Sequence, residues 1–281
     1  MNSSDLNHTS GIFVIKYGGN AMSNPELQDQ LLKKIADHHQ LGHKIVLVHG
    51  GGPEIKKLLA LGSVQSEFIG GHRKTTPETM YYVQLALRGE VNGTLVRLLN
   101  KNGAKAVGLS AKDGYMTQVR RRYHLSITNG KEVQTDIGQV GDIVRFDPEL
   151  IHLLLQSDFL PVLSPVAQGP DELDYNINAD ALAGAVAAAL NAEAYISLTD
   201  VDGLFEHWPD PDSRLKDITL EKLQTFCSNK ASGGMLPKLE SVIFALKHGA
   251  KSAFIFNGTK PDSFNLAQIH QNTAGTRITL N

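Results

Sequence analysis

Two glycine-rich segments each follow a short apolar run and precede a helical pattern. The first is Lys16-Tyr-Gly-Gly-Asn20 after "IFVIK", and the second is His49-Gly-Gly-Gly-Pro53 after "IVLVH". Consecutive glycines that lead into a helix expose backbone N–H groups in a concave nest, and the helix dipole adds to their attraction for anions. A single pair of this kind is most simply explained as a tight turn. Two pairs at successive strand ends, one directly after a lysine, predict an anion-binding site.

A third Gly-Gly pair precedes a lone lysine in "SGGMLPKLE" (232–240). A lysine in the first turn of a helix opposes the helix dipole, so helix stability does not explain its position. The alternative is a solvated surface lysine. We favour a functional role for Lys238, in which its charge meets an anion near the flexible glycines.

Two further segments carry polar side chains where an element ends or begins. "NINAD" (176–180) precedes an alanine-rich helical pattern, and "TDVDG" (199–203) ends an apolar strand-like run. Ligands of α/β sheets bind at the carboxyl ends of the strands, so these segments are expected beside the glycine-rich ones. Each asparagine alone is more simply a turn residue.

The elements that position these segments alternate between strand-like and helical patterns. Short apolar runs occur at 12–16, 45–49, 105–109, 160–164, 194–199 and 253–257, with helical patterns between most of them. This alternation predicts an α/β fold with an open, mostly parallel central sheet sandwiched between helices. Residues 115–138 alternate around Asn129-Gly130 and predict a β-hairpin excursion in the N-terminal half. The expected domains are a tail (1–11), an N-terminal lobe (12–168) and a C-terminal lobe (169–281), joined at a polar loop.

Composition excludes several classes of function. The net charge of −2 argues against nucleic acid or an anionic membrane as the partner. No apolar run approaches the roughly 18 residues of a membrane span, and the N-terminus lacks the pattern of a signal peptide. A single cysteine, Cys227, is typical of a reducing compartment, so we expect a cytoplasmic protein. "RRRYH" (120–124) is interpreted as solvated or ion-paired arginines, and no metal site of the protein's own is predicted.

Established catalytic fingerprints are missing from the sequence. GxxxxGK[ST] and a strand-linked GxGxxG are absent, which leaves a P-loop ATPase and a Rossmann dehydrogenase without support. HExxH, CxxC and GxSxG are absent as well, so zinc hydrolysis and an α/β-hydrolase nucleophile also lack support.

A series of motifs along the chain resembles the amino-acid kinase family, and within it the N-acetylglutamate kinases. They are "VIKYGGNAM", "VLVHGGGPEI", "AVGLSAKDG", "IGQVGDI", "PVLSPVA", "NINADALAGAVAAAL", "LTDVDGL" and "GGMLPKLE", from about residue 12 to the end. The resemblance implies ATP-dependent phosphorylation of the γ-carboxylate of N-acetyl-L-glutamate in arginine biosynthesis, with Mg²⁺ carried by the nucleotide. Two alternatives stay open: another acceptor (an aminoadipate derivative, glutamate or carbamate), or a catalytically silent sensor of nucleotide and amino acid. The retained Lys16, Asp180 and Lys238 argue against the sensor.

The resemblance also assigns roles to residues. A carboxylate acceptor is already ionised at neutral pH, so the chemistry needs positioning and charge neutralisation rather than a general base. Lys16 and Lys238 match the family's two transition-state lysines, and Asp180 matches the aspartate that holds them. The acceptor is expected on Gly51, Gly52, Arg73, Asn176 and Asn178. The nucleotide is expected on Gly18, Gly19, Asn20, Thr199, Asp200, Val201, Asp202, Gly203, Leu204 and Phe205.

Two segments depart from the family's pattern. Around the arginine, the family's G-L-R-V-T-D is replaced by Gly71-His72-Arg73-Lys74-Thr75-Thr76, which adds a cation and removes an acid. "VNG" (91–93) replaces V-N-K. The resemblance further implies a homodimer, for which the helix around "VNGTLVRLLN" is the predicted contact. Residues 1–11 lack the apolar spacing of the helix that arginine-inhibited members use to form a hexamer, so weak inhibition by arginine is expected.

Overall fold

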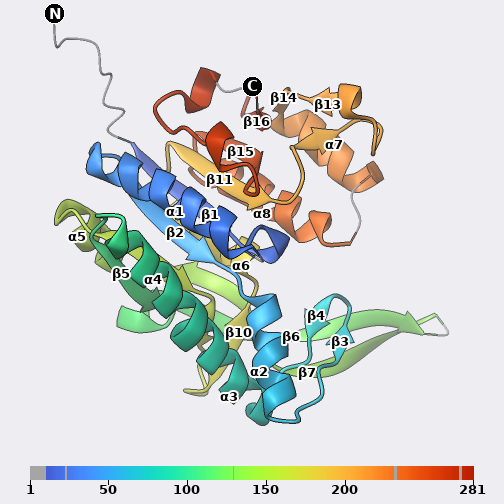
Figure 1. The fold of residues 1–281 in the computed structure, drawn as a ribbon. Coiled ribbons are helices and arrows are strands. Elements are labelled where there is room, and N and C mark those ends of the chain that lie inside the picture. The colour runs from blue at the N-terminus through green and yellow to red at the C-terminus, as the bar shows by residue number, and fades with distance from the viewer. Residues whose placement is uncertain (1–10, 23, 129, 231–232, 272–273) are drawn as a thin grey trace, which may run out of the picture.

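One sheet dominates the described part of the chain, which comprises residues 11–22, 24–128, 130–230, 233–271 and 274–281 of a computed structural model. It has eight strands in the order β14-β16-β15-β11-β1-β2-β8-β5, and every neighbouring pair is parallel except β15 and β16. The predicted fold class is confirmed (Figure 1). The strands are β1 (Ile12–Tyr17), β2 (Lys44–His49), β5 (Ala106–Ser110), β8 (Leu160–Ser164), β11 (Ala194–Thr199), β14 (Asp217–Thr219), β15 (Ser252–Asn257) and β16 (Thr276–Thr279).

Helices cover both faces of this sheet. One face packs against α1 and α4, and the other against α5, α6, α7 and α8, while α2 and α3 form a third apolar cluster with a π-helical segment, η2. The helices are α1 (Pro25–Gln40), α2 (Gly52–Leu61), α3 (Pro77–Gln84), η2 (Leu85–Val91), α4 (Asn92–Lys101), α5 (Glu149–Gln156), α6 (Ala179–Ala189), α7 (Leu220–Lys230) and α8 (Met235–Lys247). Short 3-10 turns are η1 (Gly19–Met22), η3 (Asp113–Tyr115), η4 (Pro211–Ser213), η5 (Pro261–Ser263) and η6 (Ile269–Gln271).

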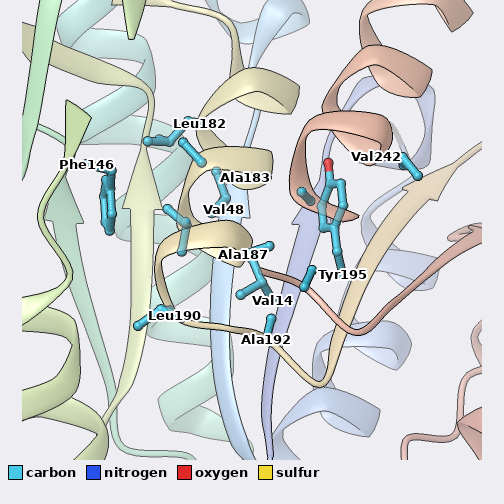
Figure 2. Packing of buried hydrophobic residues seen from close by; sticks show 14 of the residues in the cluster. Val14, Val48, Phe146, Leu182, Ala183, Ala187, Leu190, Ala192, Tyr195 and Val242 are labelled. Carbon is cyan, nitrogen blue, oxygen red and sulfur yellow. The ribbon is translucent and has the colours of Figure 1, made fainter. Parts of the chain in front are cut away.

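The alternation of side chains along β1 determines to which face of the sheet each residue points. Phe13 and Ile15 lie in the cluster with α1 and α4, whereas Val14 lies in the cluster with α6 and α8. Because side chains of a strand alternate between its two faces, Lys16 follows Val14 to the α6 and α8 face. Figure 2 shows that face, where Val14 and Tyr195 lie beneath the two helices.

A smaller β structure extends from the N-terminal half. Strands β6 (Thr117–Thr128) and β7 (Lys131–Phe146) form the predicted antiparallel hairpin, and with β9 (Val166–Gln168) and β10 (Asp174–Ile177) they close a small barrel. Asn129, at the predicted turn, lies outside the described residues. The remaining short pairs are β3 (Phe68–Ile69) with β4 (His72–Arg73) and β12 (Leu204–Phe205) with β13 (Arg214–Leu215).

The path of the chain near residue 168 bears on the predicted lobes. β10 follows the predicted boundary but pairs with β7 and β9, so the chain returns to the N-terminal barrel before it enters α6. The sheet itself runs without a break through both halves, because β1 pairs with β11. The division into 12–168 and 169–281 therefore stays a prediction, and residues 1–10 of the predicted tail lie outside the described part. Among the described helices, none is both long and apolar enough to cross a membrane.

Candidate active site

Two lysines and one aspartate, far apart in the sequence, meet at the carboxyl end of β1. Asp180 Oδ1 lies 3.0 Å from Lys16 Nζ and 3.5 Å from Lys238 Nζ. Lys16 comes from the end of β1, Asp180 from the first turn of α6 and Lys238 from the first turn of α8. The structure thus brings together the three residues to which the sequence assigns catalysis.

The electrostatics of this cluster leave one positive charge without a partner of opposite sign inside it. Lys16 is 5% exposed and Lys238 is 8% exposed, so both ammonium groups have lost most of their water. Burial, and then the charge of Lys16, lowers the pKa of Lys238. Burial alone would raise the pKa of Asp180, but the two lysines outweigh it and hold that pKa below its ordinary value. Because two buried cations share one carboxylate, the cluster favours the approach of an anion.

Close packing of α6 against α8 sets the distance between Asp180 and Lys238. A Cβ on Gly184 would lie only 2.7 Å from the carbonyl oxygen of Ser241, so the two helices touch where the glycine has no side chain. Ser241 Oγ also donates a hydrogen bond to the carbonyl oxygen of Lys238, at 2.7 Å. The hydroxyl groups of Tyr195 and Ser241 lie 3.0 Å apart, which joins β11 to the same helix.

The two glycine-rich loops lie against each other beside this cluster. Gly50 N–H donates to the carbonyl oxygen of Tyr17 at 2.8 Å. A Cβ on Gly18 would lie 3.2 Å from Gly50 N and 3.3 Å from Lys16 Nζ, so a side chain there would crowd both the loop and the lysine. Gly19 has φ +67°, a left-handed conformation that glycine adopts without strain. Asn20 lies in η1, and its side chain is outside what the structure describes.

The second loop leads into α2. Gly51 is the N-cap of α2 and Gly52 is its first residue, so both lie where the helix offers backbone N–H groups that have no partner within the helix. A Cβ on Gly51 would lie 2.7 Å from Leu87 Cδ2, whereas the space around Gly52 is open. This geometry fits the predicted nest for a carboxylate.

Arg73 lies on the β3–β4 hairpin, where two neighbours orient it. Its guanidinium carbon is 4.7 Å from the centre of the Phe68 ring, and its Nη1 donates to Ser66 Oγ. Burial lowers the pKa of Arg73, yet an arginine side chain stays charged at neutral pH. Lys74, the cation that the family pattern lacks, is paired with Glu67 at 2.9 Å across the same hairpin.

The two asparagines of "NINAD" make different contacts, and only Asn178 bonds the backbone at Asp180. Asn176 Nδ2 donates to Thr75 Oγ1 at 3.3 Å, which ties β10 to the segment after Arg73. Asn178 Oδ1 accepts hydrogen bonds from the N–H groups of Asp180 and Ala181, at 2.8 and 3.1 Å, and so caps α6. Capping occupies the side-chain oxygen of Asn178, so its amide nitrogen is the atom that remains for an acceptor. The predicted acceptor roles of both asparagines stay predictions.

The segment predicted to bind the nucleotide follows β11. Thr199 Oγ1 donates to Asp200 Oδ1 at 3.2 Å. Asp202 accepts from Asn257 Nδ2 at 2.9 Å and pairs with Lys260 Nζ at 2.7 Å. The hydrogen bond from Lys260, more than any other effect, lowers the pKa of Asp202.

The same segment then folds back over β16. Gly203 has φ +121°, and a Cβ there would lie 2.5 Å from Thr276 Oγ1. Leu204 N–H donates to that hydroxyl at 2.8 Å. Phe205 lies at the end of β12, with its ring 5.1 Å from that of Trp208. Val201 lies between these contacts, in the turn that joins Asp200 to Asp202.

Sequence reasoning missed Asn257 and Lys260. Their signal was present, because "AFIFN" ends in Asn257 and is followed by Gly-Thr-Lys260, the same polar ending that the other strands show. They reach Asp202 only because β15 lies next to β11, with Thr199 paired to Asn257.

The residues fit a nucleotide with its metal ion. The crowded cradle at Gly18 and the surplus charge of Lys16 and Lys238 suit a phosphate chain. Asp180 and Asp202 are already held by lysines, so these two carboxylates are poor direct ligands for a metal. No cluster of metal-ligating side chains occurs among the described residues.

Comparisons with known proteins give one answer for the family. The sequence model of the amino acid kinase family matches residues 11–257. The acetylglutamate kinase of Methanocaldococcus jannaschii is 38% identical over 95% of this chain and 90% of its own length. That of Archaeoglobus fulgidus is 40% identical over 96% of this chain and 93% of its own.

Solved structures show the same fold. A Streptococcus mutans protein superposes with a TM-score of 0.75 at 28% identity, covering 96% of this chain and 99% of its own. Carbamate kinase from Giardia superposes with a TM-score of 0.72 at 18% identity, covering 96% and 99%. At that identity the second likeness speaks for the fold alone.

Proposed function

Because the chain belongs to the amino acid kinase family, we propose that it transfers the γ-phosphoryl group of ATP to the γ-carboxylate of N-acetyl-L-glutamate. The products are an acyl phosphate and ADP, as expected for a step of arginine biosynthesis. The observation that carries the proposal is the pair of buried lysines on one aspartate beside the glycine loops of β1 and β2. The extent of the likeness to acetylglutamate kinases adds to it.

The acceptor enters as an anion and needs no general base. Its γ-carboxylate has a pKa of about 4 and is ionised at neutral pH. The backbone N–H groups of Gly51 and Gly52 bind that carboxylate at the start of α2, where the helix dipole favours it. Arg73 binds the α-carboxylate through the planar fork of its guanidinium. Asn176 and Asn178 hold the remainder of the acceptor.

Lys16 and Lys238 act on the phosphoryl group as it moves. The bond between the γ-phosphorus and the bridging oxygen of ADP breaks as the bond to the carboxylate oxygen forms. Charge on the transferred group is neutralised by the two ammonium groups, which Asp180 keeps at fixed positions before ATP arrives. Mg²⁺, when bound with ATP, supplies further neutralisation of the phosphates.

The nucleotide lies on the segments that follow β1 and β11. Gly18, Gly19 and Asn20 offer backbone N–H groups to the phosphates, and residues 199–205 form the loop that binds the remainder. The ion pair between Asp202 and Lys260 stabilises the shape of this loop.

Another acceptor is less well supported than N-acetylglutamate. Lys74, the cation by which this chain departs from the family pattern, already has Glu67 as its partner. The two relatives that are 38% and 40% identical to this chain are acetylglutamate kinases.

We further propose a homodimer in the cytoplasm. Tyr81 and Leu85 lie one helical turn apart and are 60% and 43% exposed, which suits a self-complementary contact. The helix around "VNGTLVRLLN", which the sequence predicts as the dimer contact, offers fewer apolar side chains for it, because Val91, Leu95 and Leu99 pack inside the same chain.

Consumption of ATP and a free, partly buried Cys227 favour the cytoplasm. Arginine sensitivity stays a prediction.

A hydroxamate assay with a panel of acceptors tests the function. With ATP and Mg²⁺, N-acetyl-L-glutamate should give hydroxamate at a higher kcat/KM than glutamate, carbamate or an aminoadipate derivative. A higher value for one of these would reassign the acceptor. Nucleotide binding without product from any acceptor would identify a sensor.

A further inference from the structure

A buried histidine lies directly before the glycines of the acceptor loop. His49 ends β2 and is 0% exposed. Its Nδ1 lies 2.7 Å from the carbonyl oxygen of Gly50, and its Nε2 lies 3.0 Å from Asn92 Nδ2. A carbonyl oxygen only accepts, so Nδ1 carries the proton and Nε2 accepts from the amide of Asn92. The tautomer of His49 is therefore determined by its two neighbours.

The partners of Asn92 complete this network. Its Nδ2 donates a second hydrogen bond to the carbonyl oxygen of Val162 at 2.9 Å. Its Oδ1 accepts from Arg88 Nη1 at 3.0 Å, and Asp113 lies 3.7 Å from the same guanidinium. The amide of Asn92 cannot rotate without losing these bonds, since its oxygen and nitrogen would exchange places.

Burial keeps His49 neutral. It is the main cause that lowers the pKa of His49 to about 4, and the positive charge of Arg88 acts in the same direction. At neutral pH the ring is thus a fixed donor at Nδ1 and a fixed acceptor at Nε2.

The bond to Gly50 has a consequence for Gly51. The C=O and N–H of a trans peptide unit point in opposite directions. With the Gly50 carbonyl held on His49, the Gly51 N–H points away from the ring. Gly50 N–H is held in turn by the carbonyl oxygen of Tyr17. Both peptide units of Gly50 are therefore fixed, although glycine is the residue with the most backbone freedom.

The π-helical segment η2 contacts the same loop. Leu87 and Val91 lie where a Cβ on Gly51 would meet them, and Asn92 follows Val91 directly. One stretch of helix therefore packs on Gly51 and orients His49. Single π-turns within helices occur often at functional sites.

We infer that His49, with its tautomer set by Asn92, is a positioning residue that aims the Gly51 N–H at the acceptor's carboxylate. The inference rests on the proposed function, in which Gly51 and Gly52 bind that carboxylate.

Two amide substitutions separate this role from ordinary packing. The Nδ2 of His49→Asn takes the place of Nδ1 and can still donate to Gly50. The amide of His49→Gln takes the place of Nε2 and satisfies Asn92, but leaves Gly50 without its donor. We expect His49→Asn to keep the acceptor KM within about 3-fold of the native value, and His49→Gln to raise it at least about 10-fold. The KM for ATP should stay unchanged in both.

His38→Leu is the control for loss of a buried histidine. His38 is 8% exposed, has a pKa lowered to about 4 chiefly by burial, and accepts a hydrogen bond from Leu266 N–H. Its replacement should lower the unfolding temperature and leave the acceptor KM unchanged. Equal KM values for His49→Asn and His49→Gln, or a raised KM in His38→Leu, would overturn the inference. No hydroxamate from the native protein would instead overturn the proposed function.

Asn92→Asp provides a second test if His49→Asn does not fold. A carboxylate at position 92 cannot donate to Nε2, so the neutral ring carries its proton on Nε2 and turns a lone pair toward the Gly50 oxygen. Only the imidazolium, present at lower pH, donates at both nitrogens. The acceptor KM of Asn92→Asp should therefore rise as pH rises, whereas the KM of the native protein stays flat between about pH 6 and 8. A flat profile in the variant would contradict the inference.

Discussion

Lys238, for which we propose a catalytic role, lies where a charged side chain costs stability. It is buried beside a second ammonium group, and the single carboxylate of Asp180 is closer to Lys16 than to Lys238. Desolvating a cation that shares its partner costs free energy of folding. In the proposed function, binding of the nucleotide's phosphates recovers this cost.

Lys238→Met should therefore separate activity from stability. We expect kcat to fall at least about 100-fold, since a donor to the moving phosphoryl group is lost, while the acceptor KM changes less than about 3-fold. The unfolding temperature should rise, because methionine fills the space without a charge. Steady-state kinetics and thermal unfolding measure both. Lys251→Met, at an exposed lysine paired with Glu193, is the control and should change neither. Survival of kcat within a few-fold would refute the role of Lys238.

The pH dependence of activity should reveal the same lysine. Because burial and Lys16 lower its pKa, Lys238 is charged at low pH and loses its proton as pH rises, before an ordinary lysine with a pKa of about 10.4 does. The alkaline fall of kcat/KM for ATP, which reports the free enzyme, should begin below that pH. Bound phosphates raise the pKa of Lys238 again, so the alkaline fall of kcat should occur at a higher pH than the fall of kcat/KM. Lys238→Arg should lack this alkaline fall, and identical profiles in the two proteins would count against the assignment.

Among the elements, the β3–β4 hairpin shows how pairing changes the meaning of a residue. Arg73 lies over Phe68, and Lys74 is neutralised by Glu67. The additional cation is therefore paired within the hairpin, and its charge should affect the proposed acceptor site only weakly.

Substitutions of the two cations on this hairpin should affect the acceptor KM differently. Arg73→Lys should raise the acceptor KM at least about 10-fold with little change in kcat, because an ammonium group lacks the planar fork. Lys74→Val should leave that KM within about 3-fold. Steady-state kinetics with N-acetyl-L-glutamate, and with a more acidic acceptor as competitor, measure these KM values. Improved use of N-acetyl-L-glutamate by Lys74→Val, together with weaker use of the competitor, would indicate a different natural acceptor.

At the scale of the whole molecule, the sheet joins the two halves. β1 pairs with β11 along four residue pairs, and one apolar cluster draws on both halves, from Val14 to Ile278. The loop proposed to bind the acceptor follows β2, and the loop proposed to bind the nucleotide follows β11, so both lie on strands that flank β1.

This continuity predicts a single unfolding transition. In calorimetry, a non-hydrolysable ATP analogue should move the entire transition to higher temperature, because it binds only the folded state. At a concentration 100 times its Kd, the analogue should add about 2.7 kcal/mol to the free energy of unfolding. Lys238→Met is the matched control and should show a smaller shift. Two transitions, of which only one responds to the analogue, would show that the halves unfold independently.

The features that the sequence by itself determined are local ones. Short apolar runs place the strands, and glycines before helices place the anion loops, because each depends on the conformation of neighbouring residues. The order of these motifs was enough for the fold class and the family. The hairpin after Tyr115 follows from the same local patterns.

Contacts between distant segments were decided by the tertiary structure alone. That Lys16 and Lys238 share Asp180 depends on the alternation of β1 and on the packing of α6 against α8 at Gly184. Asn257 meets Asp202 because β15 lies next to β11, and Asn92 meets His49 because α4 packs against β8, the neighbour of β2. The apolar face of α4, predicted to join two chains, packs within one chain for the same reason. A local pattern specifies that a face is buried, whereas the order of strands and the packing of helices decide what covers it.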